Sequence, residues 1–223
     1  GEPLTKAEKK RVLAIGIVAV LSIIFWLFYY QQDLALTIYM TKYVDMHIGS
    51  LEIPPSWITT TLNSVLCVAL GGVMAAVWKK LAERPKGDLD MFQKVGLGFL
   101  FLGIGFGILV AAELVRGVGA PESTKVNVIW LVGFSLLLTV GELSFSPLRN
   151  AFCSKYAPKK LLSLLMGLLS FSTFISSKLS PYVQVAIEKM DVFTVFVVIF
   201  IALVACAGIL FVIHKKLNKL VEE

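Results

Sequence analysis

The chain has 223 residues, of which 57% are hydrophobic and 16% charged, with a mean hydropathy of +0.81 and a formal net charge of +6. A water-soluble domain of this length cannot bury so much apolar surface, so the composition excludes a soluble globular protein and indicates the lipid bilayer as solvent. A basic chain is often a nucleic-acid binder, but these charges flank apolar segments, and we expect no nucleic-acid partner.

Six apolar segments follow one another, each near or above the roughly 20 helical residues that cross a hydrocarbon core about 30 Å thick. Lipid offers no partner for unpaired backbone groups, so such segments must be helical. The sequence therefore predicts an all-α membrane protein, a six-transmembrane-helix bundle over 12–214 with a lead-in at 1–11 and a tail at 215–223. The expected spans are 12–40, 57–78, 95–112, 126–148, 161–185 and 192–213.

The basic residues predict the orientation of this bundle. With both termini in the cytoplasm, most of the 21 Lys and Arg residues fall on the cytoplasmic side, in the lead-in, in alternate loops and in the tail. Such an excess is the usual signature of the cytoplasmic face. We therefore expect a multi-pass protein of the plasma (inner) membrane whose two termini are cytoplasmic.

The first apolar segment carries a polar interruption. In FWLFYYQQDLALTIYM, residues 25–40, the triplet Gln31, Gln32 and Asp33 breaks an otherwise apolar run. The span 12–40 would be about 43 Å long as a helix, which exceeds the hydrocarbon thickness. It must tilt, bend or protrude, and a protrusion into the cytoplasm would leave the triplet in the outer half of the membrane.

The third segment contains Gly98, Gly103 and Gly107 at helical spacing, with Gly103 and Gly107 forming a small-xxx-small pair. Close packing against another helix is the default interpretation of this pattern in membranes. We expect this glycine face to meet a neighbouring helix of the bundle.

Glu142 lies inside the fourth segment, toward its cytoplasmic half. A carboxylate there costs at least about 2.5 to 3.5 kcal/mol unless water, a partner or a proton relieves it. One interpretation is a packing ion pair with Arg149, two helical turns further on. We favour the other, a substrate or proton cavity, because ionisable residues within membrane spans are usually functional. Pro147 would loosen the same helix near Glu142.

Residues 140–173, VGELSFSPLRNAFCSKYAPKKLLSLLMGLLSFST, resemble the GEL-x-x-SP stretch and the AP-x-x-L-x-S-L-x-M-G pattern of proton-coupled oligopeptide transporters. That family belongs to the major facilitator superfamily and carries the two patterns on its tenth and eleventh helices. LTKAEKKR (4–11) and FWLFYYQQ (25–32) are similar to the lead-in and the FW-x-x-x-EQ of its seventh helix. IPPSW with Leu62–Asn63 is similar to the start of its eighth.

The resemblance runs the whole chain and implies the C-terminal six-helix half of such a transporter. It implies proton-coupled symport of di-/tripeptides or related small solutes by alternating access, with the substrate near the midplane between two bundles. The implied partners are a small peptide, the lipid bilayer, and an N-terminal six-helix half or another copy of the chain. The proton is the coupling ion, and we expect no other cofactor and no bound metal.

By motif match, Glu142 would face the cavity near the amino end of a bound peptide, because an ammonium is the natural partner of a half-buried carboxylate. Asn63 would offer its amide to the peptide backbone, or make a helix–helix hydrogen bond instead. Gln31, at the glutamine position of the seventh-helix pattern, would join the substrate site. Ser170 belongs to a polar stretch that serves either as pocket lining or as helix contact.

The family's outward gate pairs a seventh-helix glutamate with a first-helix arginine. That glutamate position is Tyr30 here, and Asp33 is a new acid nearly one helical turn later. We expect Tyr30, Asp33 and Glu142 to serve in gating or proton coupling. For Asp33 an equally weighted alternative is a hydrated helix-end carboxylate without a role.

Other departures put peptide specificity in question rather than the fold. Leu169 replaces a pocket tryptophan of many relatives, Arg149 replaces a small residue, and Lys178 replaces an uncharged one and is expected to snorkel. Nothing here corresponds to the family's first-helix E-x-x-ER motif. A non-transporting membrane subunit or scaffold that retains the half fold is therefore the alternative function. An enzyme is not expected, because a lone carboxylate without a nucleophile makes no catalytic pair.

Overall fold

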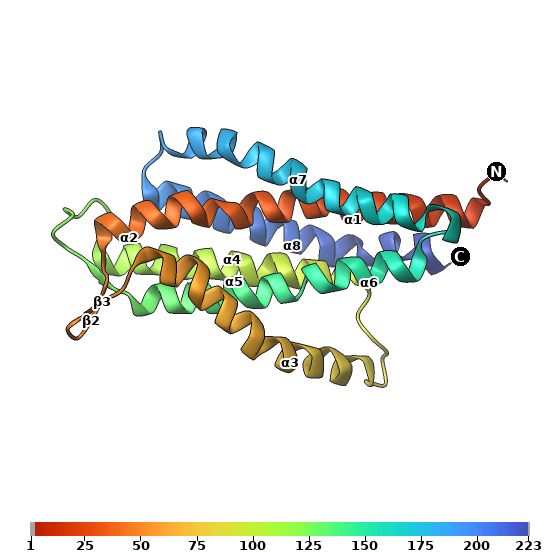
Figure 1. Ribbon diagram of the computed structural model, residues 1–223, viewed down its shortest axis with the longest axis horizontal. Helices are drawn as coiled ribbons and strands as arrows, with labels where there is room; N and C mark the ends of the chain where they lie inside the picture. The colour runs from red at the N-terminus through yellow and green to blue at the C-terminus, as the bar shows by residue number, and fades with distance from the viewer. Residues whose placement is uncertain (1–2, 223) are drawn as a thin grey trace.

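The computed structural model describes residues 3–222, and in this part of the chain six helical segments are long and apolar enough to cross a membrane. They run roughly along one common axis (Figure 1). The predicted all-α bundle of six spans is confirmed. Residues 1, 2 and 223 of the expected lead-in and tail lie outside the described residues.

The first span is one continuous helical rod made of α1 (Lys6–Gln31), the π-helical η1 (Gln32–Leu36) and α2 (Thr37–Tyr43). It begins with a capping box, in which the Thr5 hydroxyl accepts from the Glu8 amide while the Glu8 carboxylate accepts from the Thr5 amide. The π-helical turn begins within the polar triplet. Such turns interrupt α-helices at functional sites more often than elsewhere.

Short strands join the spans at the end of the bundle opposite the two termini (Figure 1). Strand β1 (Val44–Asp45) pairs in parallel with β4 (Val126–Asn127), which ties the end of the first span to the start of the fourth. Strands β2 (His47–Ile48) and β3 (Leu51–Glu52) form a hairpin whose turn uses Gly49 at φ 62°, a conformation that favours glycine.

The second span combines a π-helical η2 (Trp57–Leu62) with α3 (Asn63–Ala82), and the third is α4 (Met91–Arg116). The loop between α3 and α4 lies at the same end as both termini (Figure 1). Asp90 caps α4, where its side chain accepts from the Gln93 amide.

The fourth span is broken near Glu142. Helix α5 ends at Leu143 and α6 begins at Ser146, with Pro147 in its first turn, where a missing N–H costs no hydrogen bond. The fifth span contains Pro181 inside α7, and the sixth span is the single helix α8. The helices of the fourth, fifth and sixth spans are α5 Ile129–Leu143, α6 Ser146–Tyr156, η3 Lys159–Leu161 (3-10), α7 Leu162–Ile187 and α8 Val192–Glu222.

Helix α4 is the centre of the bundle and packs most extensively on α8 and α5, while α1 packs on α7 and α8. Its glycines allow this close approach. A Cβ added to Gly103 would lie 3.1 Å from the Cβ of Leu203, and one added to Gly107 would lie 2.9 Å from the Phe200 ring. Gly103 and Gly107 of the expected glycine face therefore meet α8, whereas Gly98 meets Gly141 on α5.

Two helices remain largely uncovered. Helix α3 has no buried residue, and Val68 at its middle is 85% exposed. Helix α7 buries only a narrow stripe against α1 and exposes Leu164, Phe171 and Tyr182. In Figure 1 these helices flank the bundle on opposite sides, with α3 leaning away from it.

Candidate functional site

Glu142 sits in the last turn of α5, directly before the break in the fourth span, and three side chains converge on one of its carboxylate oxygens. The Tyr29 hydroxyl donates to Glu142 Oε2 at 2.9 Å, and the Asn63 amide nitrogen donates to the same oxygen at 3.1 Å. The Cys67 thiol lies 3.8 Å from it. Three separate spans, the first, second and fourth, therefore meet at this carboxylate.

Asn63 is the first residue of α3, where the π-helical η2 gives way to α-helix. Its amide nitrogen lies 3.0 Å from the Thr139 hydroxyl as well as near Glu142. The Thr139 hydroxyl in turn donates to the Ser135 carbonyl at 2.8 Å. Asn63 thus makes an interhelical hydrogen bond between α3 and α5, and one of its partners is Glu142.

Neither Tyr29 nor Cys67 is predicted from the sequence as a site residue. Helical spacing signals Cys67, since it lies four residues after Asn63 and one turn places side chains on the same face. Tyr29 is held in place by aromatic packing, with its ring centroid 4.8 Å from Trp26 and 6.3 Å from Phe25. It is buried at its ring and presents the hydroxyl to Glu142.

Arg149 contacts a different part of the bundle. Its Nη1 donates to the Ser22 hydroxyl at 2.7 Å and to the Thr173 hydroxyl at 3.0 Å, which joins α6 to α1 and α7. Among the described residues no ion pair links Arg149 to Glu142. The buried Nε of Arg149 has no hydrogen-bond partner.

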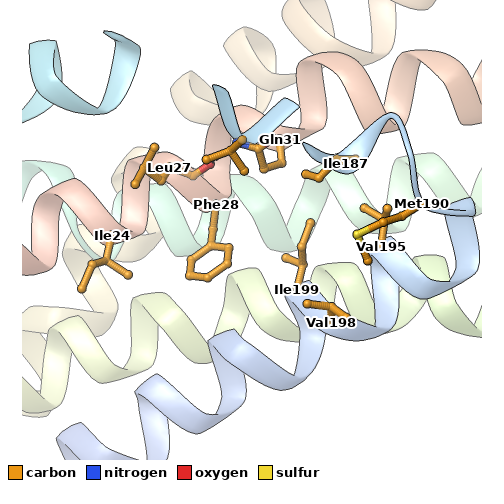
Figure 2. Close-up of a pocket in the computed structure, with 10 residues that line it drawn as sticks. Ile24, Leu27, Phe28, Gln31, Ile187, Met190, Val195, Val198 and Ile199 are labelled. Atoms are coloured by element: carbon orange, nitrogen blue, oxygen red, sulfur yellow. The ribbon is translucent and has the colours of Figure 1, made fainter. Parts of the chain in front are cut away.

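Gln31 lies apart from Glu142, although both were expected at a substrate site. Its side chain is 1% exposed and donates to the Leu27 carbonyl at 2.7 Å. It borders an apolar pocket of about 290 Å³ between α1, α7 and α8 (Figure 2). Residues that line this pocket with it are Ile24, Leu27, Phe28, Val183, Ile187, Met190, Val195, Val198 and Ile199.

Ser170 is exposed on α7, and its hydroxyl donates to the Met166 carbonyl one turn earlier at 3.2 Å. Two residues that depart from the family pattern, Leu169 and Lys178, lie on the same helix. Leu169 is buried, whereas Lys178 is exposed and places its ammonium 5.5 Å from the Phe174 ring centroid. Ser170 therefore belongs to the uncovered side of α7 rather than to the cluster around Glu142.

Tyr30 and Asp33 come together at another pocket, which is polar, has a volume of about 330 Å³ and lies between the first span and α7. The side chain of Asp33 is exposed, and no ion-pair partner for it is found within residues 3–222. The pocket walls on the α7 side are polar or small. They are Ser177, Ser180, Pro181 and Gln184.

Glu113 and Arg116 form a buried ion pair at the end of α4 opposite the termini, and the pair was not predicted from the sequence. Arg116 donates to both carboxylate oxygens of Glu113, at 2.6 and 2.9 Å. Its remaining Nη1 lies 2.9 Å from the Ala120 carbonyl, and the guanidinium carbon lies 4.1 Å from the Tyr43 ring centroid. The pair is fully satisfied, which is typical of a structural contact rather than a substrate site.

Within the described part of the chain, no group of three or more His, Cys, Asp or Glu side chains is arranged to hold a metal ion. The three cysteines, Cys67, Cys153 and Cys206, are free thiols. The cluster around Glu142 can therefore offer hydrogen bonds and one negative charge. That chemistry suits recognition of a cation or an N–H donor.

Comparison with known proteins agrees with this architecture. The model of the POT family matches residues 4–207. The chain is 27% identical to the peptide transporter YePEPT of Yersinia enterocolitica subsp. palearctica over 99% of its length, and 26% identical to a di-/tripeptide transporter of Lactococcus lactis subsp. cremoris over 82%. It spans 43% and 37% of these two relatives, so it is less than half as long as either.

The crystal structure of the peptide transporter POT in complex with sulfate superimposes with a TM-score of 0.80 at 27% identity, covering 97% of this chain and 42% of that one. The expected equivalence with one half of a major facilitator transporter is thus confirmed, as is a multi-pass membrane protein. The relatives named here are transporters and not enzymes. Since the family match extends over nearly all of the sequence, this chain belongs to the POT family.

Proposed function

We propose that the chain is the C-terminal bundle of a transporter that carries di-/tripeptides or related small solutes together with protons. The observation that carries the proposal is the convergence of Tyr29 and Asn63 on Glu142, an acid inside a membrane span. A negative charge in such a place is costly unless a partner, water or a proton relieves it, and a peptide ammonium is a suitable partner. The names of the relatives support peptides as the substrate class.

Alternating access needs a second bundle, and we propose an N-terminal six-helix half that covers α3 and α7. The two helices are apolar, of spanning length and the least covered of the bundle. Ser170, on the uncovered side of α7, would then face that half or the cavity between the halves. Gln31 would act at the same interface only if the side chain turned away from its apolar pocket.

The polar pocket at Tyr30 and Asp33 supports a gate on the outer side of the substrate cavity. An exposed carboxylate that has no cationic partner among the described residues of its own bundle is available to a cation from the second bundle. The proton as coupling ion would be carried by Glu142, Asp33 or both. The bundle would sit in the plasma (inner) membrane with its termini in the cytoplasm, as the distribution of basic residues favours.

The deciding experiment is peptide uptake by the assembled transporter carrying Glu142→Gln. Glutamine preserves the volume and the hydrogen bonds but removes the charge, so loss of a charge-assisted bond of about 1.5 to 3 kcal/mol should weaken peptide affinity roughly ten- to a hundred-fold. Asp88→Asn, on the α3–α4 loop, is the matched control. Wild-type uptake by Glu142→Gln at low peptide concentration would show that Glu142 does not bind the substrate. Absence of uptake by the wild-type assembly would instead favour a subunit that does not transport.

A further inference from the structure

The two carboxylate oxygens of Glu142 have different surroundings. Within residues 3–222, the side-chain hydrogen bonds to this carboxylate all fall on Oε2, namely those from Tyr29, Asn63 and Cys67. Oε1 receives no hydrogen bond from the residues described, and it is not among the buried atoms that lack a partner. Oε1 therefore remains accessible while Oε2 is already bound.

The three donors are not equivalent. The Asn63 amide is shared with the Thr139 hydroxyl, and a thiol 3.8 Å away is a weak donor. The Tyr29 hydroxyl donates to Glu142 at 2.9 Å, and a hydroxyl bound to a carboxylate belongs to the strong class of hydrogen bonds. Because Phe25 and Trp26 pack on its ring, Tyr29 holds this geometry without a large entropic cost.

We propose that Tyr29 is a positioning residue that makes Glu142 a one-oxygen acceptor and so selects substrates with a compact ammonium over those with a planar guanidinium. This inference rests on the proposed function, in which Glu142 receives the amino end of the substrate. It concerns how the site distinguishes an ammonium from a guanidinium.

The chemistry of the two cations gives the selectivity. An ammonium is a compact point charge that can be satisfied by a single carboxylate oxygen, here Glu142 Oε1. A guanidinium binds a carboxylate best through two parallel N–H···O bonds, which require both oxygens to be available. With the two acceptor sites of Oε2 taken by the Tyr29 hydroxyl and the Asn63 amide, the guanidinium loses its second bond and gains nothing over the ammonium.

The test compares two competitors of a labelled dipeptide in the assembled transporter: dialanine with its free amine, and the same dipeptide with the amine converted to a guanidine. The measured quantity is the ratio of their inhibition constants. Wild type should prefer the amine. Tyr29→Phe deletes only the hydroxyl, so the ratio should move toward the guanidine by about ten-fold, the equivalent of one hydrogen bond to a charged group.

Tyr43→Phe is the matched control, since it makes the same chemical change on the same span at a residue that contacts Arg116 rather than Glu142. It should keep the wild-type ratio. A purely structural role of Tyr29 would weaken both competitors equally and leave the ratio unchanged, and that result in a correctly inserted Tyr29→Phe would overturn the inference. If Tyr29→Phe fails to reach the membrane, Tyr29→Leu takes its place: a ratio shifted toward the guanidine supports the inference, and an unchanged ratio overturns it.

Glu142→Gln separates this inference from the proposed function. If Glu142→Gln weakens the amine competitor and Tyr29→Phe leaves the ratio unchanged, the substrate site stands and only the role of Tyr29 is wrong. If Glu142→Gln leaves both competitors at their wild-type inhibition constants, the substrate site itself is wrong, and the inference falls with it.

Discussion

Gly98 and Gly141 touch backbone to backbone where α4 crosses α5. A Cβ built on Gly141 would lie 3.0 Å from the Gly98 carbonyl oxygen, and one built on Gly98 would lie 3.3 Å from the Gly141 carbonyl oxygen. Since Gly141 directly precedes Glu142, this contact fixes the part of α5 that carries the acid. Position 141 accepts no side chain without moving the helix that holds the site.

Gly141→Ala should therefore destabilise the protein and reduce peptide uptake together. The added methyl meets backbone atoms, the Gly98 oxygen and the Leu102 nitrogen at 3.2 Å, which cannot turn aside as a side chain can. Overpacking of this kind costs about 1 to 3 kcal/mol. Thermal unfolding in detergent and uptake in proteoliposomes measure the two effects.

The control for this substitution is Gly133→Ala in the same helix. Its added methyl would lie 3.6 Å from the Ile108 side chain, an ordinary van der Waals distance. Alanine favours the helix by up to about 1 kcal/mol over glycine, so this variant should be as stable as wild type or more so. Equal melting temperatures for the Gly141 and Gly133 variants would contradict the proposed backbone contact.

Breaking the Glu113–Arg116 pair should destabilise the end of α4 strongly. Both side chains are buried, so Glu113→Ala leaves an uncompensated guanidinium in a site that excludes water. Removal of one partner of a buried pair costs about 3 to 5 kcal/mol. Arg116→Lys should also destabilise, because lysine cannot form both bonds to Glu113. Chemical or thermal unfolding of the purified protein measures the difference in stability between each variant and wild type.

An exposed ion pair near the same end supplies the comparison. Lys42 and Glu122 lie 3.8 Å apart with side chains 52% and 63% exposed. Exposed pairs contribute at most about 1 kcal/mol, so Lys42→Ala should change the unfolding midpoint little. A loss from Lys42→Ala as large as that from Glu113→Ala would show that burial does not set the energy of the Glu113–Arg116 pair.

The two ends of the bundle should lie on opposite sides of the membrane. We expect Lys86→Cys, on the loop between α3 and α4, to resist an impermeant thiol reagent in intact cells and to react after lysis. Ser50→Cys, on the β2–β3 hairpin, should react without lysis. Both are made in a background without the three native cysteines, and the reverse labelling pattern would invert the assigned orientation.

The bundle should associate with a second bundle in a lipid environment. Its site presents Glu142 and Asn63 between helices that are incompletely covered, and polar groups facing hydrocarbon cost several kcal/mol. Light scattering after size exclusion should show a complex, with an N-terminal half or with another copy. A well-behaved six-helix monomer in nanodiscs at low protein concentration would count against this expectation.

The sequence by itself determined the number of spans, their helical state and the family. These follow from local properties: a bilayer accepts only long apolar helices, and the GEL-x-x-SP pattern at Glu142 is contiguous in the chain. The same local reasoning singled out Glu142 as a charged group within an apolar segment, and the family resemblance placed Asn63 at the same substrate site. Their direct hydrogen bond was not predicted, because nothing in a linear pattern gives the rotation of one helix against another.

Tertiary structure decided which polar residues meet. Packing turns Tyr29 toward Glu142 and its near neighbour Gln31 toward an apolar pocket, since residues two apart on a helix point in different directions. Arg149 binds the Ser22 hydroxyl and not Glu142, because the helix is interrupted between α5 and α6. Glu142 and Arg149 therefore no longer share one helix. Helix rotation comes from the packing of all six spans together, and no single segment encodes it, whereas the break near Glu142 agrees with the loosening that Pro147 predicts locally.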